Sequence, residues 1–297
     1  MESPNRMALD LVDEAIDFAD ELNVGVHHLE GDAALLDFGT EYDGGVEAGL
    51  LLAEVATGGL ATVQTRLATV DGAALTHVEL STDHPALSLL GCQAPRWPLD
   101  LAGEDVLGGG PAQLFRPDAP ENPPLDYEET FDFAVLVVES DRLPDDALVE
   151  AVAAEAGVPT SGVFVLSAPD SSVAGRTAFA ARAAEWTVRR LVEAGCDPAT
   201  VRSIVASAPV APLASTEGET RSRSAAAIAH GGRAHVVLES DVERPEAVVA
   251  TSAPGDESAS RDVLGPAQVT VDVVDGPTHV VGTVDERRLA GELGLRP

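Results

Sequence analysis

The chain has 297 residues, of which 45% are hydrophobic and only 4% aromatic, so its core has to be packed mainly from Ala, Val and Leu. It carries 50 acidic and 18 basic residues, all of the basic ones arginine, for a formal net charge of −32. This charge repels nucleic acids and anionic lipid surfaces, so we expect neither as a partner. Because molar salt shortens the Debye length to about 3 Å and screens self-repulsion, the composition indicates a protein of a salty cytoplasm.

Other protein classes are excluded by pattern. Apolar patterning runs nearly end to end, which excludes a disordered acidic protein. The first fifteen residues lack the basic start and apolar run of a signal peptide, and no stretch approaches the length of a membrane span, so we expect a cytoplasmic protein. Cys92 and Cys196 stand alone, which indicates neither a zinc site nor a disulfide framework.

The N-terminal part mixes helical and strand patterns. Apolar residues recur at helical spacing behind the candidate caps Ser3 and Asn5 and predict a first helix over 7–22. Strands are predicted next, the first two as a hairpin around Gly31-Asp32, at 24–29, 33–38, 50–55, 60–67 and 74–80. A helix is predicted from His84-Pro85 to Leu90. The Gly- and Pro-rich stretch 108–124 is predicted to be a loop and linker.

From residue 131 the pattern changes to an alternation of strands and helices, which is typical of an α/β sheet unit. The predicted elements are strands at 134–139, 163–167, 201–207 and 234–239 and helices at 145–156, 176–194 and 221–230. The acidic, Ser/Ala-rich stretch 240–264 is predicted to be a mobile loop. A last hairpin, 269–274 with 279–284, is expected to return to the N-terminal domain. We therefore predict one α/β domain from 1–125 with 264–297 and a second from 126–263.

The predicted helix 176–194 carries the most informative side chains. Arg182, Glu185 and Arg189 lie together on the flank of its apolar stripe, near the edge of the buried face. A carboxylate there could act as a general base or acid, with Arg182 orienting it or holding an anionic ligand. The alternative is a surface ion pair at i, i+3 spacing, worth about 0.2–0.5 kcal/mol. On spacing alone the surface pair is favoured.

Three other patterns are less specific. The Gly108–Pro111 run could present N–H groups to a phosphate, but it lacks the Lys-Ser/Thr ending of a P-loop, and a flexible connector is the commoner meaning. Asp83 and His84 form a titratable pair without a further ligand at metal-binding spacing, which favours a turn. Arg221 and Arg223 lie at the start of a predicted helix, where the helix dipole disfavours cations. A nearby anionic ligand would explain this placement, and so would chance.

Several blocks of sequence, taken in order, resemble the methenyltetrahydromethanopterin cyclohydrolase family. They lie at 44–49, 58–63, 81–86, 108–112, 133–144, 180–185, 207–212 and 265–281. The resemblance covers nearly the whole chain, and the blocks together are far more specific than any one of them.

This resemblance implies an α/β (α+β) fold of two α/β domains that enclose a pterin cleft, assembled as a homotrimer. It implies a hydrolase without metal or cofactor, in which water adds to the methenyl carbon of a reduced pterin and the ring opens to a formyl pterin. The family's catalytic Arg-x-x-Glu pair falls on Arg182 and Glu185. Glu185 would activate the water and Arg182 would hold Glu185 and the intermediate. Because the methenyl carbon is already cationic, an aligned water is what the reaction needs.

The binding positions depart from the family pattern more than the catalytic pair does. The family Lys of Gln-Lys-Ala-Gly-Trp is absent unless Arg96 replaces it, the Gly-Ser-Gly-Pro-Ala-Arg motif ends in Gln113, and two polar residues after Arg223 are lost. The candidate substrate-binding residues are Asp83, His84, Gln93, Arg96, Gly109, Gly110 and Arg223. We expect Arg182, Arg223 and Arg96 to face one cleft. The alternative is a degenerate paralogue that has lost catalysis and acts as a binding or assembly subunit.

Overall fold

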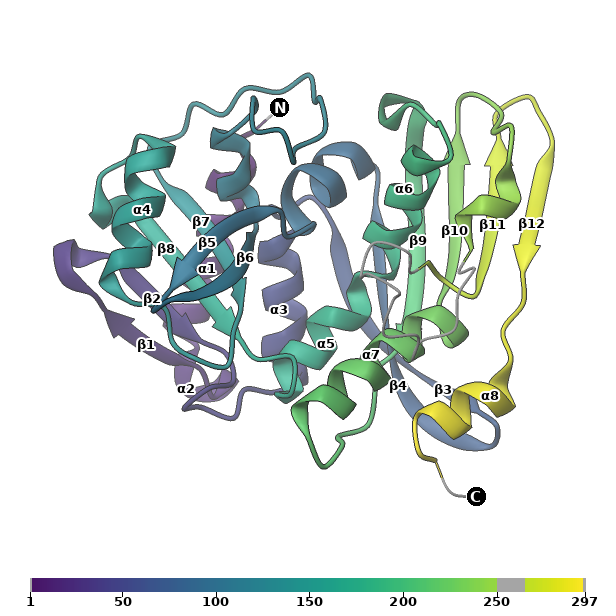
Figure 1. Cartoon of the computed structure of the whole chain (residues 1–297), viewed down its shortest axis with the longest axis horizontal. Helices are drawn as coiled ribbons and strands as arrows, with labels where there is room; N and C mark the ends of the chain where they lie inside the picture. Colours follow the sequence, from purple (N-terminus) through teal and green to yellow (C-terminus); the bar gives the residue numbers. More distant parts are fainter. Residues whose placement is uncertain (1, 250–264, 296–297) are drawn as a thin grey trace. The chain divides into compact units, whose positions relative to one another are not determined.

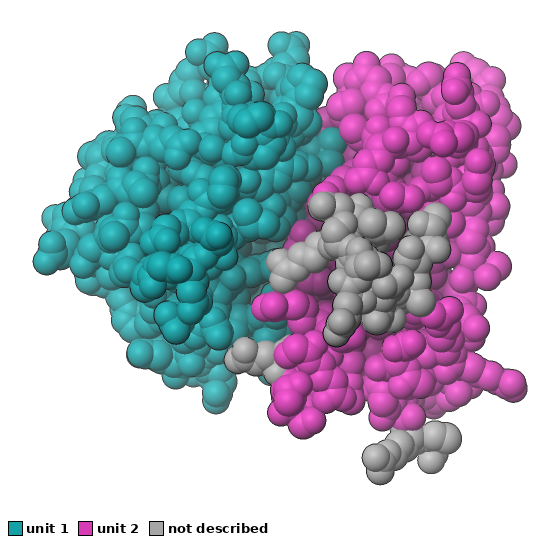
Figure 2. All heavy atoms as spheres, in the orientation of Figure 1, with its two compact units in different colours: residues 1–61, 87–178 teal, residues 62–86, 179–297 magenta. Residues whose placement is uncertain are grey.

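The computed structural model of the chain describes residues 2–249 and 265–295 (Figure 1). The chain divides into two compact units, each built from two separate stretches: residues 1–61 and 87–178 form unit 1, and residues 62–86 and 179–297 form unit 2 (Figure 2). Each unit contains a mixed six-stranded sheet with helices packed on it. The predicted α/β class is confirmed.

The sheet of unit 1 has the strand order β1-β2-β8-β7-β6-β5. Its centre is parallel, because β2 and β7 both pair with β8 in that sense, and hairpins close both edges. The strands are β1 (Gly25–His28), β2 (Ala34–Asp37), β5 (Trp97–Leu101), β6 (Glu104–Gly109), β7 (Ala134–Glu139) and β8 (Val163–Ala168).

Helices cover both faces of this sheet. Successive residues of its central strands are apolar, so both faces have to be buried. Leu36 and Phe38 pack into one core with α1 (Pro4–Asp17) and α3 (Val46–Ala56), whereas Leu35 packs into a second core with α4 (Asp146–Ala156). The α4 helix starts at the cap Asp145, whose side chain accepts from the amide of Leu148.

The sheet of unit 2 has the order β12-β11-β10-β9-β4-β3 and is antiparallel except between β10 and β11. The strands are β3 (Thr62–Val70), β4 (Ala73–Thr82), β9 (Val201–Pro209), β10 (Arg233–Leu238), β11 (Gln268–Val273) and β12 (Thr278–Gly282). Helix α6 (Ala183–Glu193) packs against β9 and β10, α7 (Glu217–Gly231) packs against β9, and α8 (Glu286–Glu292) packs against α7 and β3 (Figure 1).

The division of the chain differs from the predicted one because of two sheet pairings. The last hairpin, β11 with β12, was expected in the N-terminal domain, but β11 pairs with β10 in unit 2. The β3–β4 hairpin also belongs to unit 2, since β4 pairs with β9 across a large separation in sequence. Hairpin-rich sequence therefore occurs in both units, and local pattern could not assign it to either.

Two predicted segments have a different structure. Residues 50–55, predicted as a strand, lie inside α3, because a short run that is apolar at every position but Glu54 does not distinguish a buried helix from a strand. The predicted linker 108–124 begins with the end of β6, and the 3-10 helix η3 (Pro111–Phe115) follows it. The hairpin formed by β5 and β6 was not predicted.

The other boundaries agree more closely. The first helix begins earlier than predicted, with Ser3 as its cap, and breaks at Phe18 before the short α2 (Ala19–Leu22). The helix predicted after His84-Pro85 is present as η2 (Ala86–Gln93), whose turns are of the wide π type. In the predicted mobile loop, residues 245–248 form the 3-10 helix η6, and 250–264 lie outside the described residues. Both cysteines are free thiols, as predicted, and no helix within the described ranges is long and apolar enough to cross a membrane.

One buried polar side chain of the unit 2 sheet was not singled out from sequence. His77 lies on β4, directly opposite Arg66 of β3, and is only 2% exposed. Burial, and after it the charges of Arg66 and Arg233, lower the pKa of His77 to about 4. His77 is therefore neutral in the folded protein at physiological pH.

We predict that the variant His77→Gln loses less stability in acid than the wild-type protein does. The pKa of His77 falls from 6.5 to about 4 on folding, so between these values the unfolded chain binds a proton that the folded chain does not, and stability is lost as the pH falls through this window. The full difference amounts to about 3 kcal/mol by pH 4. The measurement is the free energy of unfolding from pH 7 to pH 4 in molar KCl.

The matched control is His235→Gln, which removes an exposed histidine from the neighbouring part of the same sheet. This control is expected to follow the wild-type curve. A pH dependence of unfolding that is the same for His77→Gln and the wild type would contradict the prediction.

Candidate active site

The predicted helix 176–194 is two helices that meet at Arg182. Helix α5 (Val173–Ala181) ends at Ala181, and α6 begins at Ala183 with Arg182 as its N-cap residue. The Arg182 amide donates to the Phe179 carbonyl, three residues back, at 3.0 Å, so the turn is tighter than in an α-helix. Neither Gly nor Pro stands at this junction, which is why the break had no signal in the sequence.

The junction places Glu185 in the first turn of α6. Glu185 is the third residue of the helix, where the positive end of the helix dipole favours a negative charge. Its side chain has no exposed surface, whereas the prediction put it at the edge of the buried face. The predicted apolar stripe is present, because Ala184 and Val188 of α6 are buried, and Glu185 is buried beside them.

Arg182 holds one oxygen of this carboxylate. Its Nε and Nη2 atoms both donate to Glu185 Oε2 at 3.3 Å, and the Arg182 side chain is only 12% exposed. Glu185 Oε1 is buried and has no hydrogen-bond partner within residues 2–249 and 265–295. The site therefore presents a fixed carboxylate with one occupied oxygen and one vacant acceptor.

Two aromatic rings flank the Arg182 guanidinium. The guanidinium carbon lies 5.4 Å from the ring centre of Phe179 and 5.8 Å from that of Trp186, and the two rings meet edge to face at 5.6 Å. Such contacts favour the cation and fix its plane. Sequence reasoning missed both rings, although their spacing of three and four residues from Arg182 along the helices could have identified them. Arg189, predicted on the same flank, instead pairs with Glu193 at 3.6 Å.

Unit 2 also carries three of the predicted binding residues. Asp83 and His84 are exposed in the turn after β4, where the His84 amide donates to Thr82 Oγ1 at 3.0 Å. Arg223 donates to the Leu213 carbonyl at 3.0 Å and pairs with Glu219 at 2.8 Å. Helix α7 begins at Glu217, four residues before the predicted start, so Arg223 lies in its second turn and the expected conflict with the helix dipole does not arise.

The other four predicted binding residues come together in unit 1. The Gly110 amide donates to the Cys92 carbonyl at 2.8 Å, and a Cβ on Gly109 would lie 3.3 Å from the Gln93 carbonyl. Gln93 is buried, and its Oε1 has no hydrogen-bond partner in the described part of the chain. The Arg96 guanidinium donates to the Leu90 carbonyl. Gly110 has φ +86°, and a Cβ there would lie 2.9 Å from the Val135 carbonyl oxygen. The backbone conformation and the close contact therefore require glycine at this position.

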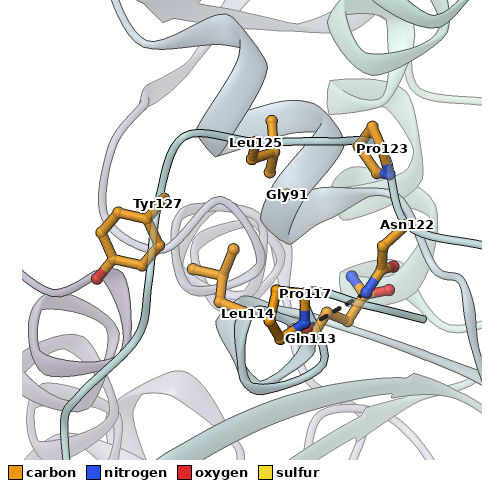
Figure 3. A pocket seen from close by; sticks show the side chains of 8 residues that line it. All are labelled: Gly91, Gln113, Leu114, Pro117, Asn122, Pro123, Leu125 and Tyr127. Atoms are coloured by element: carbon orange, nitrogen blue, oxygen red, sulfur yellow. Dashed lines mark hydrogen bonds between the residues drawn. The ribbon is translucent and has the colours of Figure 1, made fainter.

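Gln113 lines a small hollow on unit 1 beside these residues, and its side chain holds the surrounding backbone. Apolar side chains and Asn122 surround the hollow, and Figure 3 shows Gln113 at its wall. Gln113 Nε2 donates to the carbonyls of Cys92 and Ala94 at 2.8 and 2.9 Å, and its Oε1 accepts from the Arg96 amide at 3.0 Å. All the hydrogen-bonding atoms of this side-chain amide hold the backbone, so Gln113 supports the loop structure.

No group of three His, Cys, Asp or Glu side chains that could hold a metal ion occurs among the described residues.

The arrangement at Glu185 can accept a proton from a bound molecule at Oε1 while Arg182 keeps the carboxylate in place.

The sequence of the chain is similar to those of one family of known proteins. A family model described as Cyclohydrolase (MCH) matches residues 3–261. The methenyltetrahydromethanopterin cyclohydrolase of Halobacterium salinarum is 46% identical over 99% of this chain and 100% of its own length. The proteins of the same name from Methanocella arvoryzae and Methanococcus aeolicus are each 34% identical, over 72% and 81% of this chain and 68% and 76% of their own lengths. The chain therefore belongs to the cyclohydrolase (MCH) family.

Proposed function

We propose that the chain catalyses the reversible hydrolysis of the methenyl bridge of methenyltetrahydromethanopterin, or of a related tetrahydropterin, as a step of one-carbon metabolism. The observation that carries this proposal is the state of Glu185, whose Oε2 is held by Arg182 and whose buried Oε1 has no partner among the described residues. A carboxylate in this state is suited to align and deprotonate a single water molecule.

The chemistry follows from the charge of the substrate. Water adds through its oxygen to the cationic methenyl carbon, and Glu185 Oε1 takes up one of its protons. The bond from this carbon to one of the two nitrogens then breaks, that nitrogen takes a proton, and the formyl group stays on the other nitrogen. One proton is released overall. Arg182 keeps Glu185 oriented, and a carboxylate beside a delocalised cation stabilises that cation.

Further parts of the proposal concern substrate binding, cofactor use, oligomeric state and cellular environment. We infer that Gln93 contacts the pterin, since its buried Oε1 is an acceptor without a partner in the part of the chain that the structure describes, and pterins carry N–H donors. Asp83, His84, Arg96, Gly109, Gly110 and Arg223 stay predicted substrate-binding residues. We further infer an enzyme that uses neither metal nor cofactor and forms a homotrimer in a salty cytoplasm. The net charge of −32 and the relative from Halobacterium salinarum support the last point.

The alternative, a paralogue without catalysis, rests on the changed binding positions. The hydrogen bonds of Gln113 show that one of these positions now serves the backbone. The intact pair of Arg182 and Glu185 favours the enzyme, because a buried carboxylate with an unsatisfied oxygen is costly to keep without a use. Purified protein in molar KCl, given methenyltetrahydromethanopterin or methenyltetrahydrofolate, should accelerate the loss of methenyl absorbance. If neither pterin is hydrolysed faster than in buffer, the chain is not this enzyme.

We predict that Glu185→Gln lowers kcat by about 10²–10⁴-fold, because the amide cannot accept the proton of the attacking water. The measurement is the initial rate of methenyl absorbance loss under saturating substrate. The matched control is Glu193→Gln at the end of the same helix, where the carboxylate pairs with Arg190 at 2.8 Å near the surface. This control should keep the wild-type rate. Circular dichroism in molar KCl checks that both variants are folded, and a folded Glu185→Gln with wild-type kcat would refute the assignment of the base.

We predict that Arg182→Lys lowers kcat by about 10-fold or more although the positive charge is kept. A lysine cannot donate from two nitrogens to Glu185 Oε2 and does not stack on Phe179 and Trp186 as a planar group does. The rate is compared with that of Arg189→Lys, which makes the same change about two turns further along at an arginine paired with Glu193. Equal rates for the two variants would mean that only the charge at position 182 matters.

A further inference from the structure

A cluster of polar side chains lies on one face of the unit 2 sheet. Arg66 of β3 is directly opposite His77 of β4, Glu79 of β4 is opposite Ser207 of β9, and Ser207 is opposite Arg233 of β10. Residues directly opposite each other project from the same face, and so do alternate residues along one strand. These five side chains therefore share one face of the sheet. They come from four adjacent strands, β3, β4, β9 and β10 (Figure 1).

The contacts inside the cluster neutralise only one of its two arginines. Arg66 Nε pairs with Glu79 Oε2 at 3.5 Å, and Arg66 Nη2 donates to Ser207 Oγ at 3.0 Å. Glu79 Oε1 also accepts from the side-chain Nε2 of Gln64 at 3.0 Å. The hydroxyl hydrogen of Ser207 stays available as a donor.

Arg233 has no carboxylate partner in this arrangement. In residues 2–249 and 265–295 its guanidinium makes neither a hydrogen bond nor an ion pair. The chain has 50 acidic residues for 18 arginines, so an arginine without a carboxylate is unexpected. With His77 neutral, Arg66, Glu79 and Arg233 give the cluster a formal charge of +1.

His77 supplies the second, independent observation. Its side chain is 2% exposed, and neither ring nitrogen has a hydrogen-bond partner within the described ranges. A buried polar group without a partner requires an explanation, and a bound group that accepts its N–H is one. The position of His77 opposite Arg66 points this N–H to the same side of the sheet as the two guanidinium groups.

We propose that Arg66, His77, Ser207 and Arg233 form a binding site for a small inorganic oxyanion of the sulfate or phosphate type. Planar guanidinium groups match oxyanion geometry, and the Ser207 hydroxyl and a His77 N–H add two further donors. The anion would balance the cluster's charge and join β3, β4, β9 and β10. This site is separate from Glu185 and does not depend on the proposed reaction.

Binding is expected to strengthen as the pH falls. A bound anion favours protonated His77, so by linkage it raises the pKa of His77 above the value of about 4 found without it. The charged and titratable groups on this face are Arg66, Glu79, Arg233, His235 two residues further along β10, and Asp272 of β11, which accepts from the Thr278 hydroxyl at 2.8 Å. Strand β9 contributes Ser207 and no titratable side chain.

The test uses the full chain and two measurements. Crystals soaked in selenate should show an anomalous peak within hydrogen-bonding distance of Arg66 and Arg233. In solution, sulfate affinity is measured calorimetrically at constant ionic strength for the wild type, Arg66→Gln and Arg233→Gln. Each variant should bind sulfate about tenfold or more weakly, because a charge-assisted hydrogen bond is lost. The control Arg202→Gln, which removes an exposed arginine of β9 that pairs with Glu239, should bind as the wild type does.

Two results would overturn the proposal. One is the absence of an anomalous peak at the cluster together with unchanged sulfate affinity in both variants. The other is unchanged sulfate affinity with a changed association state of Arg66→Gln or Arg233→Gln in light scattering, which would assign the cations to a carboxylate of a second copy of the chain.

Discussion

A carboxylate without exposed surface has to be balanced by a cation, since an unpaired charge in a protein interior costs several kcal/mol. Glu185 is such a carboxylate, and Arg182, three residues earlier, balances it. The balance is uneven, because both donors of Arg182 reach the same oxygen. The second oxygen is left as a buried acceptor, and this acceptor is what the proposed reaction requires. The pair of Arg182 and Glu185 thus provides both the charge balance and the acceptor for the reaction.

The break between α5 and α6 determines where this pair lies. It makes Arg182 the cap of a new helix and Glu185 a residue of the first turn, where the helix dipole favours the carboxylate. The same dipole disfavours a cation at this end, so the dipole does not explain the position of Arg182. The carboxylate and the rings of Phe179 and Trp186 do explain it, since all three contact the guanidinium.

The local pattern identified most elements of the fold, and the errors share a physical cause. Residues 50–55 are apolar except for Glu54 and show no clear hydrophobic period, so tertiary burial in α3 decided their structure. The hairpin β11–β12 was recognised, but its sheet was not, because a pairing with β10 is a long-range choice. At the candidate site, the spacing of Arg182 and Glu185 predicted the ion pair and favoured a surface one. The burial of Glu185 depends on packing that the spacing does not contain. The role of His77 depends on cross-strand register, which no single strand reveals.

Salt screens the charges on the surface of the chain much more than it screens the buried pair of Arg182 and Glu185. Exposed pairs such as Arg142 with Glu104 and Arg202 with Glu239 contribute about 0–1 kcal/mol each, and less where molar salt shortens the Debye length to about 3 Å. Salt that screens the repulsion of 50 acidic residues also weakens these surface attractions. Ions cannot enter between Arg182 and Glu185 without exposing the carboxylate, so that pair is screened far less. A chain of this charge can therefore require salt to fold while the interaction on which its proposed catalysis depends stays nearly independent of salt.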